Sequence, residues 1–214
     1  MDRRPLKVRG ANWAKNLASL LAKIGLTPNI ISIFSVVFAF LVLFTGTFAK
    51  SNEYYFLLSA VLIQLRLICN LLDGMVAVEH GKSSPNGELY NDVPDRFADI
   101  FIIIGGSLSI VDRGYTLSAV NLAWIASCLA VITAYVRVLG KSLGTKSYFI
   151  GPMAKQHRMF LMTLAFIAEF FLSGTNYSTR FLYIILVVIT IGSFLTIFRR
   201  LALISSDLLS GEIE

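Results

Sequence analysis

The sequence of 214 residues contains little charge and little cysteine. Charged residues make up 15% of the chain and hydrophobic residues 56%, whereas soluble domains carry roughly 25% charged residues. The mean hydropathy of +0.71 agrees with this composition. These values exclude a disordered chain and argue against a soluble globular domain, which could not bury so much apolar surface. The two cysteines, Cys69 and Cys128, lie in apolar runs without zinc-site spacing, so a disulfide scaffold is also excluded.

The remaining class is an all-α polytopic membrane protein, because about 20 apolar residues suffice for one transmembrane helix. We predict one domain over residues 1–214, with a six-helix transmembrane bundle over 26–204 and a tail over 205–214. The sequence shows no internal repeat and no interdomain linker. The six predicted spans are 30–49, 54–78, 90–111, 117–139, 156–173 and 180–204.

The segment before the first span is basic and amphipathic. Within residues 1–25, the apolar side chains from Trp13 to Ile24 recur at spacings of three and four, and Lys15 and Lys23 lie off that stripe. This pattern predicts a helix that lies on the membrane surface.

Basic residues are distributed unevenly between the two ends of the predicted bundle. Fourteen of the 19 Lys and Arg residues fall on the side of the two termini, and Lys50, Arg113 and Arg180 fall on the other side. Positive charge favours the cytoplasmic side, so we expect both termini in the cytoplasm. We interpret the net charge of +6 as a sign of topology and of contact with an anionic lipid bilayer, not of nucleic-acid binding.

Acidic residues concentrate where the second and third spans meet. Six of the 13 lie between residues 73 and 99, and ionisable groups inside a membrane tend to be functional. Helical spacing places Asn70 and Asp73 on one face, and Asn91, Asp95 and Asp99 on one face of the next helix. Such oxygen-rich faces fit Mg²⁺ or Mn²⁺, and a hydrogen-bonded polar patch between helices is the alternative. For Asp92 and Arg96, four residues apart, we expect a structural ion pair.

Small residues accompany these acids. Gly74, Ala77 and Gly87 allow a neighbouring group to approach the backbone closely. That group is either a packed helix or, beside a metal site, a nucleotide.

The stretch from Asn70 to Asp95 resembles the signature of the CDP-alcohol phosphotransferases, D-x2-D-G-x2-A-R-x8-G-x3-D-x3-D. Five of its eight defined positions match at unbroken spacing, and the departures are Asn70, Val78 and Asn91. Six spans, cytoplasmic termini and an amphipathic start also resemble that family, so the likeness covers nearly the whole chain. The eight positions fall on Asn70, Asp73, Gly74, Ala77, Val78, Gly87, Asn91 and Asp95.

The resemblance implies an enzyme of a bacterial cytoplasmic membrane that transfers a phosphatidyl group from CDP-diacylglycerol to a small polar alcohol and releases CMP. It implies Asn70, Asp73, Asn91 and Asp95 as ligands of Mg²⁺ or Mn²⁺, with Asp95 also the general base. It implies Gly74, Ala77 and Gly87 at the nucleotide, and a homodimer. Because two Asp positions are Asn, we expect weaker metal binding, or one metal where the full pattern supports two.

A second basic cluster is the candidate for binding the acceptor. Arg137 ends the fourth span, and Lys155 and Arg158 open the fifth, where a helix amino terminus and cations together favour phosphate. The acceptor would then carry a phosphate; positive-inside anchoring is the alternative. Asp99 is a further candidate for the acceptor hydroxyls. We expect Glu169 at the outer membrane interface.

Three other functions are weighed against this one. The donor could be a CDP-linked small alcohol with diacylglycerol as the acceptor. The chain could instead be an inactive relative that acts as a lipid-binding scaffold, although replacement of Asp by Asn keeps an oxygen ligand of the same size. An ion transporter would need a polar path through the outer half of the membrane, and the second and third spans have no acids there.

Overall fold

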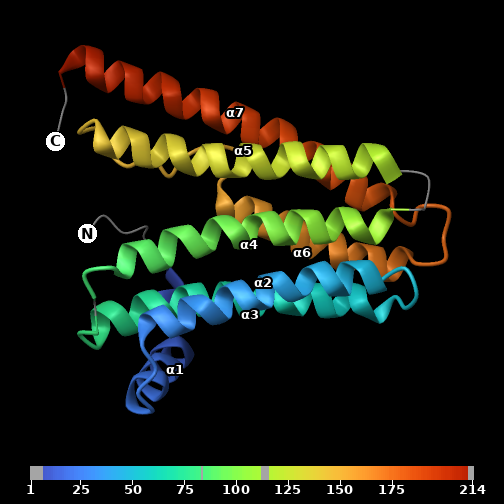
Figure 1. Ribbon diagram of the computed structural model, residues 1–214, viewed down its shortest axis with the longest axis horizontal. Coiled ribbons are helices and arrows are strands. Elements are labelled where there is room, and N and C mark those ends of the chain that lie inside the picture. The colour runs from blue at the N-terminus through green and yellow to red at the C-terminus, as the bar shows by residue number, and fades with distance from the viewer. Residues whose placement is uncertain (1–6, 83, 112–115, 212–214) are drawn as a thin grey trace.

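The computed structural model describes residues 7–82, 84–111 and 116–211, which are helical apart from short connections. These ranges contain a short 3₁₀ helix and seven α-helices, so the all-α prediction is confirmed for them (Figure 1). The elements are η1 (Lys7–Gly10), α1 (Asn12–Lys23), α2 (Pro28–Phe48), α3 (Tyr54–Glu79), α4 (Gly87–Ile110), α5 (Thr116–Ser142), α6 (Lys155–Leu172) and α7 (Arg180–Ser210).

Four of these helices, α2, α3, α5 and α7, are long and apolar enough to cross a membrane. The helices α4 and α6 are not among the four: α4 has several charged residues in its first half, and α6 has 18 residues and begins with a basic turn. The structure therefore supports four candidate spans within the described residues, and six spans stay a prediction.

The six long helices form a closed ring. The helix α2 packs on α3 and α4, α5 joins α4 to α7, and α6 joins α3 to α7. The end of α3, the start of α4 and the ends of α5 and α7 lie at one end of the bundle, beside which α1 projects at an angle (Figure 1). We call this the polar end.

Local sequence signals explain where the helices begin and end. Pro28 occupies the first turn of α2, and the Thr27 side chain accepts a hydrogen bond from the backbone N–H of Ile30 at 3.4 Å. The predicted surface helix corresponds to α1. The predicted tail begins within α7, which continues through residues 205–210, with Asp207 buried against the bundle.

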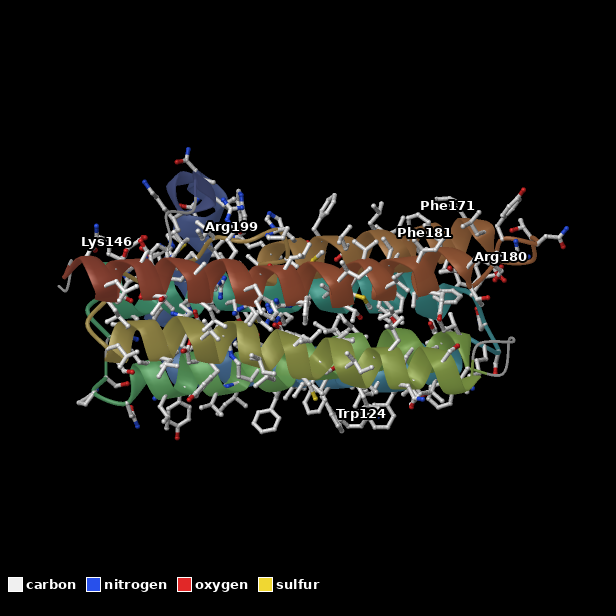
Figure 2. All side chains as sticks on the ribbon, turned by 90° about the horizontal axis from the view of Figure 1, so that it is seen from above. Trp124, Lys146, Phe171, Arg180, Phe181 and Arg199 are labelled. Carbon is white, nitrogen blue, oxygen red and sulfur yellow. The ribbon has the colours of Figure 1, made fainter. Side chains whose placement is uncertain are left out.

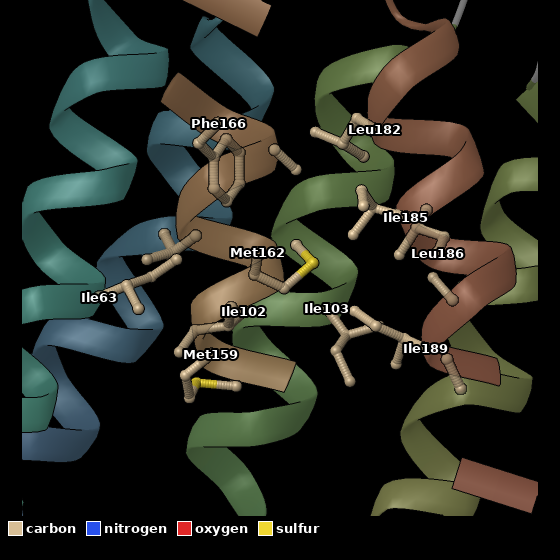
Figure 3. Close-up of a cluster of buried hydrophobic side chains, with 14 of the residues drawn as sticks. Ile63, Ile102, Ile103, Met159, Met162, Phe166, Leu182, Ile185, Leu186 and Ile189 are labelled. Carbon is tan, nitrogen blue, oxygen red and sulfur yellow. The ribbon is translucent and has the colours of Figure 1, made fainter. Parts of the chain in front are cut away.

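Apolar packing fills the middle of the ring. Ile63, Ile102, Met162, Phe166 and Leu186 come from α3, α4, α6 and α7 and meet in one buried cluster (Figure 3). Between α2 and α4 the backbones approach closely: a Cβ added at Gly46 would lie 2.1 Å from the carbonyl oxygen of Gly105. Glycine at both positions therefore lets α2 pack tightly on α4.

The outward faces of the ring are also apolar. Trp124 is 56% exposed and Phe171 73% exposed, and both point away from the bundle (Figure 2). Apolar side chains on outer helix faces match the surroundings of a lipid bilayer.

Candidate functional site

A pocket of about 390 Å³ opens at the polar end of the ring. Its wall comes from η1, α3, α4, α5, α6 and α7, with the loop before α6. The predicted site residues in this wall are Asn70, Asp73, Gly74, Asn91, Asp95, Arg137, Lys155 and Arg158. The other three, Ala77, Gly87 and Asp99, lie outside the described wall. Eight of the eleven predicted site residues therefore line this one pocket, although they come from four helices.

Asp95 lies at the centre of a network of donors from two other helices. Its Oδ1 accepts hydrogen bonds from the Arg66 guanidinium at 3.2 Å and from the Asn70 amide at 2.5 Å. Its Oδ2 accepts a hydrogen bond from the ammonium group of Lys155, with which it forms an ion pair. Both carboxylate oxygens are therefore bound by cations or by an amide.

Two serines of α2 orient the polar residues of α3. Ser35 donates a hydrogen bond to Oδ1 of Asn70 at 2.6 Å, and Ser32 donates one to Oδ2 of Asp73 at 2.7 Å. Because a carboxylate can only accept hydrogen bonds, the side of Asn70 that faces Asp95 must be its NH₂ group. Asn70 thus connects α2 to α4 through its amide.

Asp99 lies one turn deeper and is 1% exposed. It forms an ion pair with Arg158 at 2.6 Å and another with Arg66 at 3.2 Å. Arg158 also donates to the backbone carbonyl of Met153 at 2.8 Å and to the hydroxyl of Thr133 at 3.3 Å. Asp99 and Arg158 therefore connect α4, α5 and α6 behind the pocket.

Arg137 lies on the α5 side of the pocket. It forms a hydrogen-bonded ion pair with Asp92 at 3.1 Å, and its guanidinium lies 5.2 Å from the centre of the Phe149 ring. The expected pair of Asp92 with Arg96 is also present, at 3.7 Å. Asp92 thus has two basic partners, and Arg137 is fixed at the edge of the pocket.

Basic residues outnumber acidic ones in the described wall of the pocket, seven to four. A concave surface with an excess of positive charge attracts phosphate groups. The acids are Asp73, Glu88, Asp92 and Asp95, and the basic residues are Arg9, Arg96, Arg137, Lys141, Lys155, Arg158 and Arg200.

Two of the four metal ligands that the resemblance implies, Asn70 and Asp95, are already engaged within the protein. In the part of the chain that the structure describes, no group of three or more His, Cys, Asp or Glu residues could hold a metal ion. Asp95 is already bound by Lys155 and Arg66, and Asn70 directs its NH₂ group, not its oxygen, toward Asp95. Asp73 and Asn91 also line the pocket, and carboxylate and amide oxygens are ligand types that Mg²⁺ or Mn²⁺ takes together with substrate phosphates.

Sequence reasoning did not assign roles to several residues of the site. Ser32 and Ser35 lie three residues apart in an apolar helix, and polar groups on one face of such a helix are the signal that could have identified them. Arg200 is 5% exposed and donates to the backbone carbonyls of Ile150 at 2.9 Å and Thr133 at 2.5 Å. Its burial depends on the folded loop before α6, which no local pattern indicates.

Comparison with known proteins supports the family that the motif from Asn70 to Asp95 suggested. The family model described as CDP-alcohol phosphatidyltransferase matches residues 25–198. Comparison with curated proteins found no match.

Solved structures show the same fold. The phosphatidylinositol phosphate synthase of Mycobacterium tuberculosis with CDP-DAG bound is 17% identical with a TM-score of 0.73, covering 91% of this chain and 94% of that one. The same enzyme with manganese and citrate is 17% identical with a TM-score of 0.74, covering 89% and 88%. With the family match over most of its length, the chain belongs to the CDP-alcohol phosphatidyltransferase family and is a transferase.

Proposed function

We propose that the protein transfers a phosphatidyl group from CDP-diacylglycerol to a small polar alcohol or alcohol phosphate and releases CMP. The observation that carries this proposal is the pocket at the polar end, where Asp95 shares a wall with an excess of basic residues. The related synthase binds CDP-DAG in its solved structure, which supports the choice of donor.

The chain's own residues supply most of what the reaction needs. Attack on a pyrophosphate depends on charge neutralisation and positioning, and the basic wall provides both. Asp95 takes the proton of the acceptor hydroxyl, whose oxygen then forms a bond to the lipid-side phosphorus. The bond from that phosphorus to the oxygen of CMP breaks, and CMP leaves with the electron pair.

Gly74, Ala77 and Gly87 are proposed to lie beside the nucleotide, where small side chains leave room for close approach. Of these, Gly74 lines the pocket. One Mg²⁺ or Mn²⁺ ion bound by Asp73 and Asn91 would supply polarisation of the phosphate when present. Manganese in the related synthase supports a divalent ion in the family.

The acceptor is proposed to bind on the side of the pocket formed by α5 and α6. Arg137 reaches the pocket and suits an acceptor that carries a phosphate, and Lys155 lines the same pocket as a second phosphate-binding cation. Arg158 and Asp99 bind each other at 2.6 Å, so their contribution is to fix the start of α6 rather than to contact the acceptor as separate charges.

For the membrane arrangement we propose six spans, with both termini and the active site on the cytoplasmic side of a bacterial membrane. The positive charge near the polar end supports this orientation. A homodimer through membrane helices is proposed from the family resemblance alone.

The test is CMP release by purified protein in detergent, with CDP-diacylglycerol, Mg²⁺ or Mn²⁺, and a panel of alcohols and alcohol phosphates. We expect release that requires one acceptor and falls by roughly 10²- to 10⁴-fold in Asp95→Asn. Lys146→Met, which removes an exposed charge outside the pocket, is the control and should release CMP at the wild-type rate.

The alternatives give different results. Release that needs CDP-choline and diacylglycerol would show the reversed assignment of donor and acceptor. Binding of CDP-diacylglycerol without release under any condition would contradict the proposal and support a lipid-binding scaffold.

A further inference from the structure

We infer that Lys155 takes the place of a second metal ion in this site. Its ammonium group pairs with Asp95 and neutralises it before substrate binds. Given the proposed function, the Lys155 side chain then moves to pair with the donor pyrophosphate when the donor binds. The site therefore uses one divalent ion and one ammonium group where a site with four acidic ligands would use two ions.

The position of Lys155 supports this role. It is the first residue of α6, lines the pocket and pairs with Oδ2 of Asp95. The start of α6 is fixed by a hydrogen bond from the Met153 backbone N–H to Thr196 at 2.9 Å and by the bond from Arg158 to Met153. The backbone at Lys155 is thus anchored, and its side chain occupies the place of a cation beside Asp95.

Arg96 forms only a long ion pair with Asp95, at 4.0 Å, and the two cations that hydrogen-bond to Asp95 differ in how far they can move. The Arg66 side chain is 0% exposed and also binds Asp99, whereas the Lys155 side chain is 23% exposed and faces the pocket. Arg66 is therefore a permanent partner of Asp95. Lys155 has a flexible stem and is the partner that an arriving phosphate can attract, which frees Oδ2 of Asp95 for the acceptor hydroxyl.

Asparagine at position 70 is more compatible with an ammonium group beside Asp95 than with a second metal ion there. Asn70 donates to Asp95 at 2.5 Å and accepts from Ser35 at 2.6 Å. An aspartate here could not donate to Asp95 and would add a negative charge beside it, which a further cation would have to neutralise. Asn70 and Lys155 are thus complementary: one removes a negative charge and the other supplies a positive one.

The first experiment counts bound Mn²⁺ by electron paramagnetic resonance on the purified full-length protein without substrate. We expect no more than one Mn²⁺ per chain in the wild type. The double variant Asn70→Asp/Lys155→Met restores a carboxylate and removes the ammonium group, and we expect it to bind one Mn²⁺ more than the wild type. Asn70→Asp/Lys146→Met is the matched control, with the same change in net charge and Lys155 intact, and should not gain that ion.

Two results would overturn the inference. One is a wild-type chain that binds two Mn²⁺ ions, a result that does not depend on whether any variant folds. The other is equal gain of Mn²⁺ in the double variant and its control. Because these counts need no turnover, they stand even if CMP release shows the proposed function to be wrong.

Kinetics then separate the role of Lys155 from that of a purely structural residue. We expect Lys155→Met to lower kcat for CMP release by roughly 10²-fold, and Lys155→Arg, which keeps the charge, to recover part of the loss. If kcat were unchanged in Lys155→Met while Asp95→Asn was inactive, the inference that the Lys155 ammonium group pairs with the pyrophosphate would be wrong.

Discussion

Two carboxylates are buried at opposite ends of the bundle, and they are stabilised in different ways. Asp99, 1% exposed near the polar end, binds the side chains of Arg66 and Arg158 from two other helices. Glu169, 0% exposed near the end of α6, accepts hydrogen bonds from the backbone N–H groups of Thr179 at 2.6 Å and Leu182 at 2.9 Å. Glu169 is thus buried between α6 and α7 near the end of its helix, and its expected place at the outer membrane interface stays a prediction.

The two carboxylates also differ in whether their partners are shared with the pocket. Arg66 is shared between Asp99 and Asp95, so the buried pair is electrically coupled to the pocket. The partner of Glu169 is the amino terminus of α7, whose N–H groups and helix dipole carry partial positive charge and stay in place. Glu169 thus connects α6 to α7 and is independent of the pocket.

The largest effect on stability is expected for Arg66→Met. This change leaves two buried carboxylates, Asp95 and Asp99, without a shared cation, and we expect the free energy of unfolding to fall by about 3 to 5 kcal/mol. Thermal or denaturant unfolding in detergent micelles measures it. Arg96→Met, which removes only longer ion pairs to Asp92 at 3.7 Å and to Asp95 at 4.0 Å, is the control with an expected loss of under about 1 kcal/mol. Equal losses in the two variants would show that the buried network contributes no more than a surface pair.

A smaller effect is expected for Glu169→Gln. The amide keeps the size of the side chain and one acceptor oxygen but loses the charge that favours the start of α7, so the free energy of unfolding should fall by about 2 kcal/mol. Because Glu169 is independent of the pocket, CMP release per folded chain should stay at the wild-type value. Reduced release in a variant of unchanged stability would contradict the separation of the two ends.

The sequence predicted the helices well because their signals are local. Apolar runs of sufficient length, the Thr27–Pro28 start of α2 and the amphipathic pattern of α1 lie within short windows of the chain. The motif also placed Asn70 and Asp95 on facing helices, since spacing along two consecutive helices fixes which faces can meet. In the structure the Asn70 amide donates a hydrogen bond to Asp95.

The partners in the network could not be predicted, because they depend on packing between distant segments. Ser32 meets Asp73 across 41 residues, and Lys155 meets Asp95 across 60. No periodicity in one helix shows which helix lies opposite, and the ring order of α2, α4, α5, α7, α6 and α3 follows from the whole fold. From sequence alone, a basic residue at the start of a helix is equally consistent with a membrane anchor and with the partner of a buried acid.

The smallest effect is expected where the loop before α6 is attached to the end of α7. The hydroxyl of Tyr148 donates to Oδ2 of Asp207 at 2.6 Å, in the part of α7 that was predicted as a tail. Tyr148→Phe removes this hydrogen bond to a charged group, and we expect a loss of about 1.5 kcal/mol in the free energy of unfolding. Because the same loop leads into Lys155, the KM for CDP-diacylglycerol should rise while Glu169→Gln leaves it unchanged. A KM that rises equally in both variants would show that the two ends of the bundle are coupled. Asp99 and Glu169 would then differ in how they are stabilised, but not in whether they affect the pocket.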